Sequence, residues 1–125
     1  MILSTGIDIV EVYRIAETMT RTPRFGERVF TAAERAYCDA KGAAAAQSYA
    51  GRFAAKEAFL KALQTGWRGK ITWHDIEILS DDQGVPSMNV TGEASTLFKK
   101  TGASRMHISI SHTSEHAVAF VIFEQ

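Results

Sequence analysis

An alanine-rich segment between residues 44 and 63 predicts one long helix, which the sequence would end before Gly66. On a helical wheel with about 100° per residue, Ala55, Ala58 and Ala62 fall on one side of this helix. Side chains this small allow a neighbouring element to approach the helix backbone closely. We therefore expect the sheet of the protein to pack directly against that side.

The other side of the same helix carries ionisable side chains. Glu57 and Lys61 lie about 40° apart on the wheel, and Arg52 and Lys56 form a second pair about a quarter of a turn away. An exposed ion pair between residues four apart contributes about 0.2–0.5 kcal/mol and explains most such spacings. The alternative is a binding role for this charged side, and the helix alone does not decide between the two.

Shorter periodic segments surround the long helix. Thr31 and Glu34 have the spacing of a capping box at a helix start, and Thr91 is expected to cap another helix. The sequence predicts strands at residues 2–10, 71–79, 85–90, 106–112 and 117–123, and further helices at 11–20, 31–41 and 91–101. This order predicts an α+β fold, a single domain over residues 1–125 with a mostly antiparallel sheet that helices pack against on one side.

Composition argues against several classes of function. The 14 basic residues balance the 14 acidic residues, so general binding to nucleic acid is not expected. The single cysteine, Cys38, cannot form an internal disulfide and fits a reducing compartment. The N-terminal stretch lacks the basic region of a signal peptide, and no apolar run approaches the roughly 18 residues of a membrane span. We expect a cytoplasmic protein that does not bind membranes.

A carboxylate interrupts the first predicted strand. Asp8 stands among β-branched residues, where it must be hydrogen-bonded, paired with a cation or bound to a metal. Together with Glu57 it would supply two oxygen ligands from different elements, which suits a magnesium ion that keeps waters and also binds a substrate phosphate. Lys61 could neutralise charge on that phosphate. The ion-pair interpretation of Glu57 and Lys61 remains the alternative.

The end of a second strand also carries polar side chains. Ile108 and Ile110 should face one way and Ser109 and Ser111 the other. His112 follows at the strand end, where ligand contacts are common, although a structural role is more frequent for a lone histidine. A serine hydrolase is not supported, because the sequence contains no GxSxG turn.

Four arginines follow the first predicted helix and its continuation. Arg14, Arg21, Arg24 and Arg28 would form a local positive strip on a chain without net charge. Solvated surface is the usual explanation of such residues, and docking of an acidic protein is the alternative. Phe25 is the only aromatic residue between these arginines, so the repeated interleaving typical of surfaces that bind single-stranded nucleic acid is not present.

Three stretches in this order, GIDIVEV (6–12), RFAAKEAFLKAL (52–63) and SISHT (109–113), resemble the signature sequences of the holo-acyl-carrier-protein synthases, the short-chain type of 4′-phosphopantetheinyl transferase. Their order and separations agree, and the resemblance extends over essentially the whole chain. It implies a transferase of fatty acid biosynthesis. The serine hydroxyl of an apo-acyl carrier protein attacks the β-phosphate of coenzyme A, phosphopantetheine is transferred, and 3′,5′-ADP leaves.

The resemblance also implies roles for individual residues. Asp8 and Glu57 match the ligands of Mg²⁺, and Lys61 matches a lysine on the phosphates. Glu57, directly or through a metal-bound water, is the first candidate for the base that accepts the serine proton, and His112 is the second. The positions that match the surroundings of coenzyme A are Arg52, Lys56, Lys61, Gly66, Pro86, Ser111, His112 and Thr113. Arg14 and its basic neighbours match the helix that meets the acidic helix II of the carrier protein.

Short-chain members of this family form homotrimers with active sites between subunits. The resemblance therefore implies that His112 and the region 84–86 serve a site whose Asp8 and Glu57 belong to an adjacent chain. Longer relatives have an acidic residue two positions after the first metal ligand, where this chain has Val10, so water is expected to fill that coordination position. Two rivals remain, a noncatalytic module that binds coenzyme A or a nucleotide and a purely structural trimer.

Overall fold

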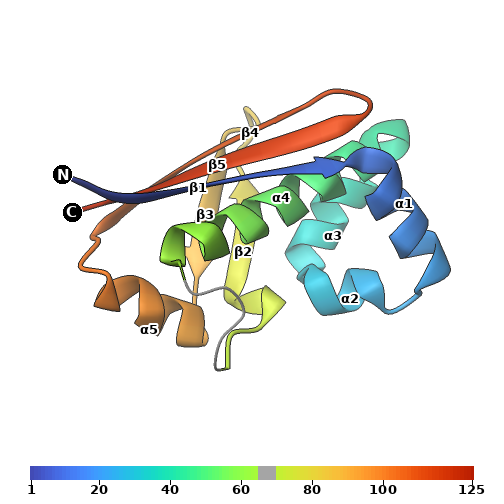
Figure 1. Ribbon diagram of the computed structural model, residues 1–125. Coiled ribbons are helices and arrows are strands. Elements are labelled where there is room, and N and C mark those ends of the chain that lie inside the picture. Colours follow the sequence, from blue (N-terminus) through green and yellow to red (C-terminus); the bar gives the residue numbers. More distant parts are fainter. Residues whose placement is uncertain (65–69) are drawn as a thin grey trace.

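The computed structural model describes residues 1–64 and 70–125 and confirms the α+β class (Figure 1). The elements follow in the order β1 (Ile2–Glu11), α1 (Val12–Arg21), α2 (Phe25–Val29), α3 (Ala32–Asp39), η1 (Gly42–Ala44), α4 (Ala45–Leu63), η2 (Trp73–Asp75), β2 (Ile76–Ser80), β3 (Pro86–Val90), α5 (Gly92–Lys100), β4 (Arg105–His112) and β5 (His116–Glu124). In the part of the chain that is described, no helix is both long and apolar enough to cross a bilayer.

The described strands form two antiparallel sheets. One has the order β1-β5-β4, and the other is the pair β2-β3. The predicted strand over 71–79 begins only at Ile76, because Trp73–Asp75 is a short 3₁₀ helix. The Asp75 side chain accepts hydrogen bonds from the backbone N–H and the hydroxyl of Thr72 and so keeps this segment out of the sheet.

Helix α4 is buried between these sheets and the other helices. Its alanines, the inner side chains of β2 and those of β5 form one apolar cluster, whereas its first turns pack with α1, α2 and α3 in a second cluster. Figure 1 shows the three-stranded sheet lying along α4, with α1 to α3 gathered at one end and α5 at the other. The opposite face of that sheet exposes Ile7, Ile9 and Phe120, which are 56%, 65% and 38% accessible.

Strand β1 and helix α4 touch through their backbones at Gly6. A Cβ atom at this position would lie 1.9 Å from the carbonyl oxygen of Ala58 and 2.7 Å from the backbone nitrogen of Ala62. The Ser4 hydroxyl donates to the carbonyl of Ala62 at 2.8 Å. The predicted close approach to the alanine side of the helix is therefore confirmed, and glycine is the residue that permits it.

Helix ends agree with the sequence in part. The capping box of Thr31 and Glu34 at the start of α3 is confirmed. Thr91 is the N-cap residue of α5, as predicted, but its side chain makes no capping hydrogen bond. Its backbone N–H donates instead to the carbonyl of Asp75. Helix α4 ends at Leu63, and the C-cap residue Gln64 has a left-handed conformation with φ 63°. The predicted stop at Gly66 lies outside the described residues.

Candidate functional site

Asp8 points toward α4 because successive side chains of a strand alternate between its two faces. Gly6 and Asp8 share the inner face of β1, so the backbone contact at Gly6 brings the Asp8 side chain beside the last turns of the helix. The carboxylate is 15% exposed, and its Oδ1 accepts a hydrogen bond from the Lys61 Nζ at 3.0 Å. The ion pair of Lys61 is thus with Asp8 rather than with Glu57 four residues before it.

Glu57 is the second carboxylate at this crossing. Burial raises its pKa, and the charge of Asp8 raises it further, while Lys61 acts in the opposite direction. Two carboxylates this close repel each other, and a cation between them would relieve the repulsion. Among the described residues Glu57 makes no hydrogen bond, so its oxygens are available to an ion.

The donor set at the crossing fits a hard divalent cation. Asp8 and Glu57 offer only oxygen ligands, and no group of three or more His, Cys, Asp or Glu side chains gathers anywhere in residues 1–64 and 70–125. Magnesium commonly binds through one or two carboxylates, waters and substrate phosphates, so two protein ligands suffice. The residues present therefore fit Mg²⁺.

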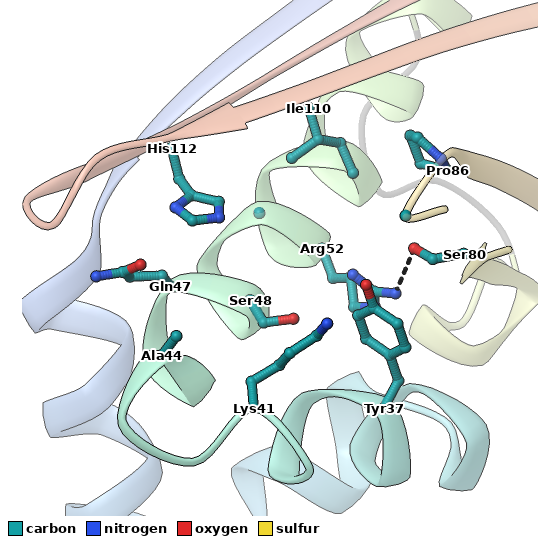
Figure 2. Close-up of a pocket in the computed structure, with 12 residues that line it drawn as sticks. Tyr37, Lys41, Ala44, Gln47, Ser48, Arg52, Ser80, Pro86, Ile110 and His112 are labelled. Carbon is teal, nitrogen blue, oxygen red and sulfur yellow. Dashed lines mark hydrogen bonds between the residues drawn. The ribbon is translucent and has the colours of Figure 1, made fainter. Parts of the chain in front are cut away.

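A pocket of about 250 Å³ opens on a different side of α4 (Figure 2). Its lining residues come from α3, the connection with η1 that follows it, α4, the facing ends of β2 and β3 with their turn, and β4: Tyr37, Lys41, Ala44, Gln47, Ser48, Gly51, Arg52, Ser80, Gly84, Pro86, Ile110 and His112. None of these described lining residues is acidic, whereas Lys41 and Arg52 are cationic. The pocket is therefore suited to an anionic ligand.

Arg52 forms part of the pocket wall although only 5% of its surface is exposed. Its Nη2 donates to the Ser80 hydroxyl at 2.9 Å, as the dashed line in Figure 2 shows. The guanidinium carbon lies 4.1 Å from the ring centroid of Tyr37. The Nε atom is buried and has no hydrogen-bond partner within the described structure. A buried donor without a partner is costly, which marks a place where a ligand oxygen would be stabilised.

The residues at the end of β4 separate onto two sides. Ile108, Ile110 and His112 alternate onto the inner face, and Ile110 and His112 line the pocket. Ser111 lies on the other face of the sheet and does not reach this pocket. Thr113 lies in the turn to β5, where its Oγ1 accepts hydrogen bonds from the backbone N–H groups of Glu115 and His116.

Lys56 is not part of the charged side expected for α4, so that prediction is wrong. The side chain is fully buried, and its Nζ lies 2.9 Å from Glu34 Oε1 in an equally buried ion pair. Nζ also donates to the backbone carbonyls of Trp73 and Ile76. Since all three ammonium donors are used, Lys56 cannot contact a ligand without leaving its partners. The helical wheel missed this because α3 and β2 cover a side of α4 that the sequence leaves open.

The four arginines of the predicted strip are all exposed. Arg14 pairs with Glu11 at 3.0 Å, and Arg21 pairs with Glu17. Arg14 also borders a groove of about 540 Å³ between α1, the end of β1 and α4. The groove is mostly apolar, with Ile9, Val10, Ile15, Phe25 and Phe53 among its lining residues. Of the four arginines only Arg14 lines the groove, together with its partner Glu11, so the groove adds an apolar surface beside the exposed arginines.

One chain does not bring all predicted site residues together. Asp8, Glu57 and Lys61 meet at the β1–α4 crossing, whereas Arg52, Pro86 and His112 line the pocket, and the two sets share no residue. Sequence reasoning did not find Tyr37, Lys41, Gln47 or Ser48. Tyr37 and Lys41 are four residues apart at the end of a predicted helix, a weak signal that gains meaning only when α3 is seen to lie beside α4.

The fold and the site together define an α+β protein with a carboxylate pair where β1 crosses α4 and, on another side of α4, a pocket whose described lining contains basic but no acidic side chains. The chain belongs to the 4′-phosphopantetheinyl transferase superfamily, whose family model matches residues 4–121. The resemblance found in three stretches of sequence is thereby confirmed.

Curated relatives match this chain along nearly their whole length. The holo-[acyl-carrier-protein] synthase of Koribacter versatilis is 50% identical over 125 residues, covering 99% of both chains. That of Geobacter metallireducens is 46% identical over 126 residues, covering 100% of this chain and 99% of the relative.

Solved structures of the same family superpose on the fold. The holo-[acyl-carrier-protein] synthase of Neisseria meningitidis matches with a TM-score of 0.87 at 34% identity and covers 100% of both chains. A synthase from Bacillus anthracis, solved in complex with CoA (3′,5′-ADP), matches with a TM-score of 0.80 at 39% identity, covering 99% of this chain and 97% of that one.

Proposed function

We propose that this chain transfers the 4′-phosphopantetheine group of coenzyme A to a serine hydroxyl of apo-acyl carrier protein, releases 3′,5′-ADP and so serves fatty acid biosynthesis. The observation that carries the proposal is the meeting of Asp8, Glu57 and Lys61 where β1 crosses α4. The names of the relatives support the reaction, and the Bacillus anthracis complex supports the donor. One domain over residues 1–125 would carry the activity.

The site residues supply what phosphoryl transfer requires, namely positioning and neutralisation of charge. Asp8 and Glu57 would hold Mg²⁺ through their carboxylate oxygens. When bound, the ion stabilises negative charge on the diphosphate. The Lys61 ammonium, 55% exposed and held by Asp8, would add positive charge on the same side of α4.

Transfer also moves one proton. The serine oxygen forms a bond to the β-phosphorus of coenzyme A, the bond from that phosphorus to the bridging oxygen breaks, and 3′,5′-ADP departs. Glu57, which the resemblance to the family brings forward, is the first candidate for the base that accepts the serine proton. His112 is the second candidate for this role.

The acid-free pocket would receive the nucleotide end of coenzyme A. Arg52 and Lys41 provide its positive charge, and Pro86 and His112 close the side formed by the β2–β3 turn and β4. The buried Nε of Arg52, which lacks a partner within the described structure, supports a phosphate there. Gly66, also expected near coenzyme A, lies outside the described residues. Lys56 contributes through the packing of α4 and not by contact.

A homotrimer with sites between neighbouring subunits would join the two separated sets of residues. The pocket of one chain, with His112, would face Asp8 and Glu57 of the next. The exposed apolar side chains Ile7, Ile9 and Phe120 on the outer face of the three-stranded sheet support association through that face. On that same face Ser111 would lie at or near a subunit boundary.

The carrier protein would dock on the strip of Arg14, Arg21, Arg24 and Arg28. The exposed guanidinium groups suit the acidic surface of an acyl carrier protein, and the apolar groove beside Arg14 would accept its apolar side chains. We place the protein in the cytoplasm, where this partner and coenzyme A would meet it.

One experiment tests the reaction itself. Apo-acyl carrier protein, coenzyme A and Mg²⁺ are incubated with the protein, and the intact mass of the carrier protein is measured. A gain of one phosphopantetheine group, absent when EDTA is added or the acceptor serine is replaced by alanine, is the expected result. Binding of coenzyme A without any gain in carrier mass would instead identify a noncatalytic module and overturn the proposal.

A further inference from the structure

Two positive charges lie close to the ring of Tyr37 at the pocket wall. The guanidinium carbon of Arg52 is 4.1 Å from its ring centroid, and the ammonium nitrogen of Lys41 is 4.6 Å from the same centroid. Both distances lie within the range of cation–π attraction, which strengthens when the cation is removed from water. Figure 2 shows Tyr37 rising from α3 with its ring beside Arg52, while Lys41 extends along the neighbouring side.

The ring and one hydroxyl fix the position of Arg52. The Ser80 hydroxyl accepts a hydrogen bond from Arg52 Nη2, and the Tyr37 ring packs against the guanidinium group. Only 5% of the Arg52 surface is exposed. Nε has no hydrogen-bond partner in the described part of the chain. The guanidinium group is thus held in place with one donor left over, an arrangement that an isolated protein would not favour without a ligand.

The charges near the ring lack an opposite charge from the protein. Lys41 and Arg52 both contact the ring, and no Asp or Glu is found among the described residues that line the pocket. Two cations this close repel each other until an anion arrives. A phosphate monoester carries up to two negative charges and three acceptor oxygens, so it would satisfy both cations and the remaining donor.

We propose that Tyr37 is a positioning residue that stacks against Arg52 and Lys41 and thereby makes the pocket select ligands with a second phosphate monoester. The inference rests on the proposed function, because it concerns the nucleotide end of the same donor. Tyr37 itself contacts the cations rather than the phosphate. Its effect is therefore on the discrimination between 3′,5′-ADP, which has the second phosphate, and AMP, which lacks it.

Two variants at one position separate the ring from the hydroxyl. In Tyr37→Leu the stacking surface is lost, and in Tyr37→Phe it is kept. Calorimetric titration should show that Tyr37→Leu weakens 3′,5′-ADP binding about 3- to 30-fold, the range expected for a desolvated cation–π contact, while AMP binding changes little. Tyr37→Phe should keep most of the discrimination. Tyr13→Leu, which removes an exposed tyrosine of α1, is the control and should bind both nucleotides as the unaltered protein does.

A second measurement reports on Arg52 without any nucleotide. The Nε–H proton of Arg52 should give a ring-shifted NMR signal, which Tyr37→Leu moves toward the position of a free arginine and Tyr37→Phe leaves in place. Equal weakening of 3′,5′-ADP and AMP by Tyr37→Leu, or an unchanged Arg52 signal in that variant, would overturn the positioning role. Binding of neither nucleotide by the unaltered protein would also overturn the proposal. If the nucleotides bound as expected but no phosphopantetheine reached the carrier protein, the proposed function would fail and the role of Tyr37 would stand.

Discussion

Lys61 contacts a different partner from the one that its own helix suggests. Glu57 is four residues away, which predicts an ion pair along the helix, yet the ammonium binds Asp8 across the β1–α4 crossing at 3.0 Å. The sequence indicated that Asp8 needed a partner, because a carboxylate in an apolar strand is costly. It did not indicate which cation, because residues 8 and 61 are joined only by the packing at Gly6.

Substitution of either carboxylate tests the site at the scale of single atoms. Asp8→Ala and Glu57→Ala should each reduce transfer to carrier protein at least about a hundredfold, because each removes a direct ligand of the proposed magnesium ion. Both side chains lie at the edge of the core, so the thermal unfolding midpoint should change little. Holo-carrier formation is measured by mass, with Glu115→Ala as a control in the β4–β5 turn. Near-normal rates in either variant would refute the assignment.

Tyr37 and Tyr49 are expected to ionise on opposite sides of the ordinary tyrosine range. A hydrogen bond with Ser80 lowers the pKa of Tyr37, with Lys41 acting in the same direction against burial. Burial raises the pKa of Tyr49, and its hydrogen bond to Asp39 adds to the rise. Alkaline titration followed by tyrosinate absorbance should contain an early step that Tyr37→Phe removes and a late step that Tyr49→Phe removes.

The raised pKa of Tyr49 also predicts how the stability of the fold changes with pH. Because folding raises the pKa of Tyr49, its contribution to stability is intact below the ordinary tyrosine pKa and declines as the pH rises above it. Unfolding by urea should therefore become easier in that alkaline range, and less so in Tyr49→Phe. A common midpoint for all tyrosines would contradict both expectations.

The length of α4 and its packing against a strand were predictable from the sequence, but the burial of its Lys56 was not. Its length and its close approach to a strand followed from the alanines, and the start of α3 followed from a capping box that is local in sequence. The short helix α2 was missed, and β2 was begun too early, because Thr72 and Asp75 form a local turn that looks like alternating strand. Features that depend on neighbouring residues in the sequence could thus be predicted, whereas the covering of α4 by α3 and β2 could not.

The buried pair of Glu34 and Lys56 joins α3, α4 and β2. Glu34 accepts from the backbone N–H groups of Thr31 and Ile78 at 2.8 Å each, while Lys56 donates to two carbonyls. Lys56→Met should lower the free energy of unfolding by about 3–5 kcal/mol, because it leaves a buried carboxylate without its cation. Urea titration measures this loss.

A double variant separates the pair from its unpaired halves. Glu34→Leu combined with Lys56→Met removes both charges, so it should be more stable than Lys56→Met alone. The comparison is a double-mutant cycle, and additive losses from the two single changes would show that the charges do not depend on each other. Burial of Lys56 lowers its pKa, and the attraction of Glu34 opposes that shift, as expected for a coupled pair.

At the scale of the whole molecule, the two sets of site residues do not meet within one chain. Neither the fold nor the sequence joins Asp8 and Glu57 to the pocket that His112 lines. If neighbouring subunits complete the site, a mixture of Glu57→Ala and His112→Ala chains, unfolded and refolded together, should regain activity that neither variant has alone. Phosphopantetheine transfer is measured on the mixture and on each variant refolded separately. Activity no greater than the sum of the separate samples would rule out shared sites.

The proposed docking of the carrier protein would use a surface separate from the pocket, namely the exposed arginines of α1 and the residues that follow it. Arg14→Glu should weaken affinity for apo-acyl carrier protein about 10-fold or more, because it replaces attraction to an acidic helix by repulsion. Affinity for coenzyme A should stay the same, since Arg14 does not line the pocket proposed to receive its nucleotide end. Titration with each ligand provides the comparison. Equal losses for the two ligands would remove the reason to place the carrier protein on this strip.

The missing Cβ atom of Gly6 determines how close Asp8 on β1 comes to Glu57 on α4. With only hydrogen at the α-carbon of residue 6, the strand rests on the carbonyl of Ala58, and the next inward side chain on that strand is Asp8. A methyl group at residue 6 would push β1 away from α4 and move the Asp8 carboxylate away from Glu57. Both carboxylates would remain, but they would no longer be close enough to bind the same cation.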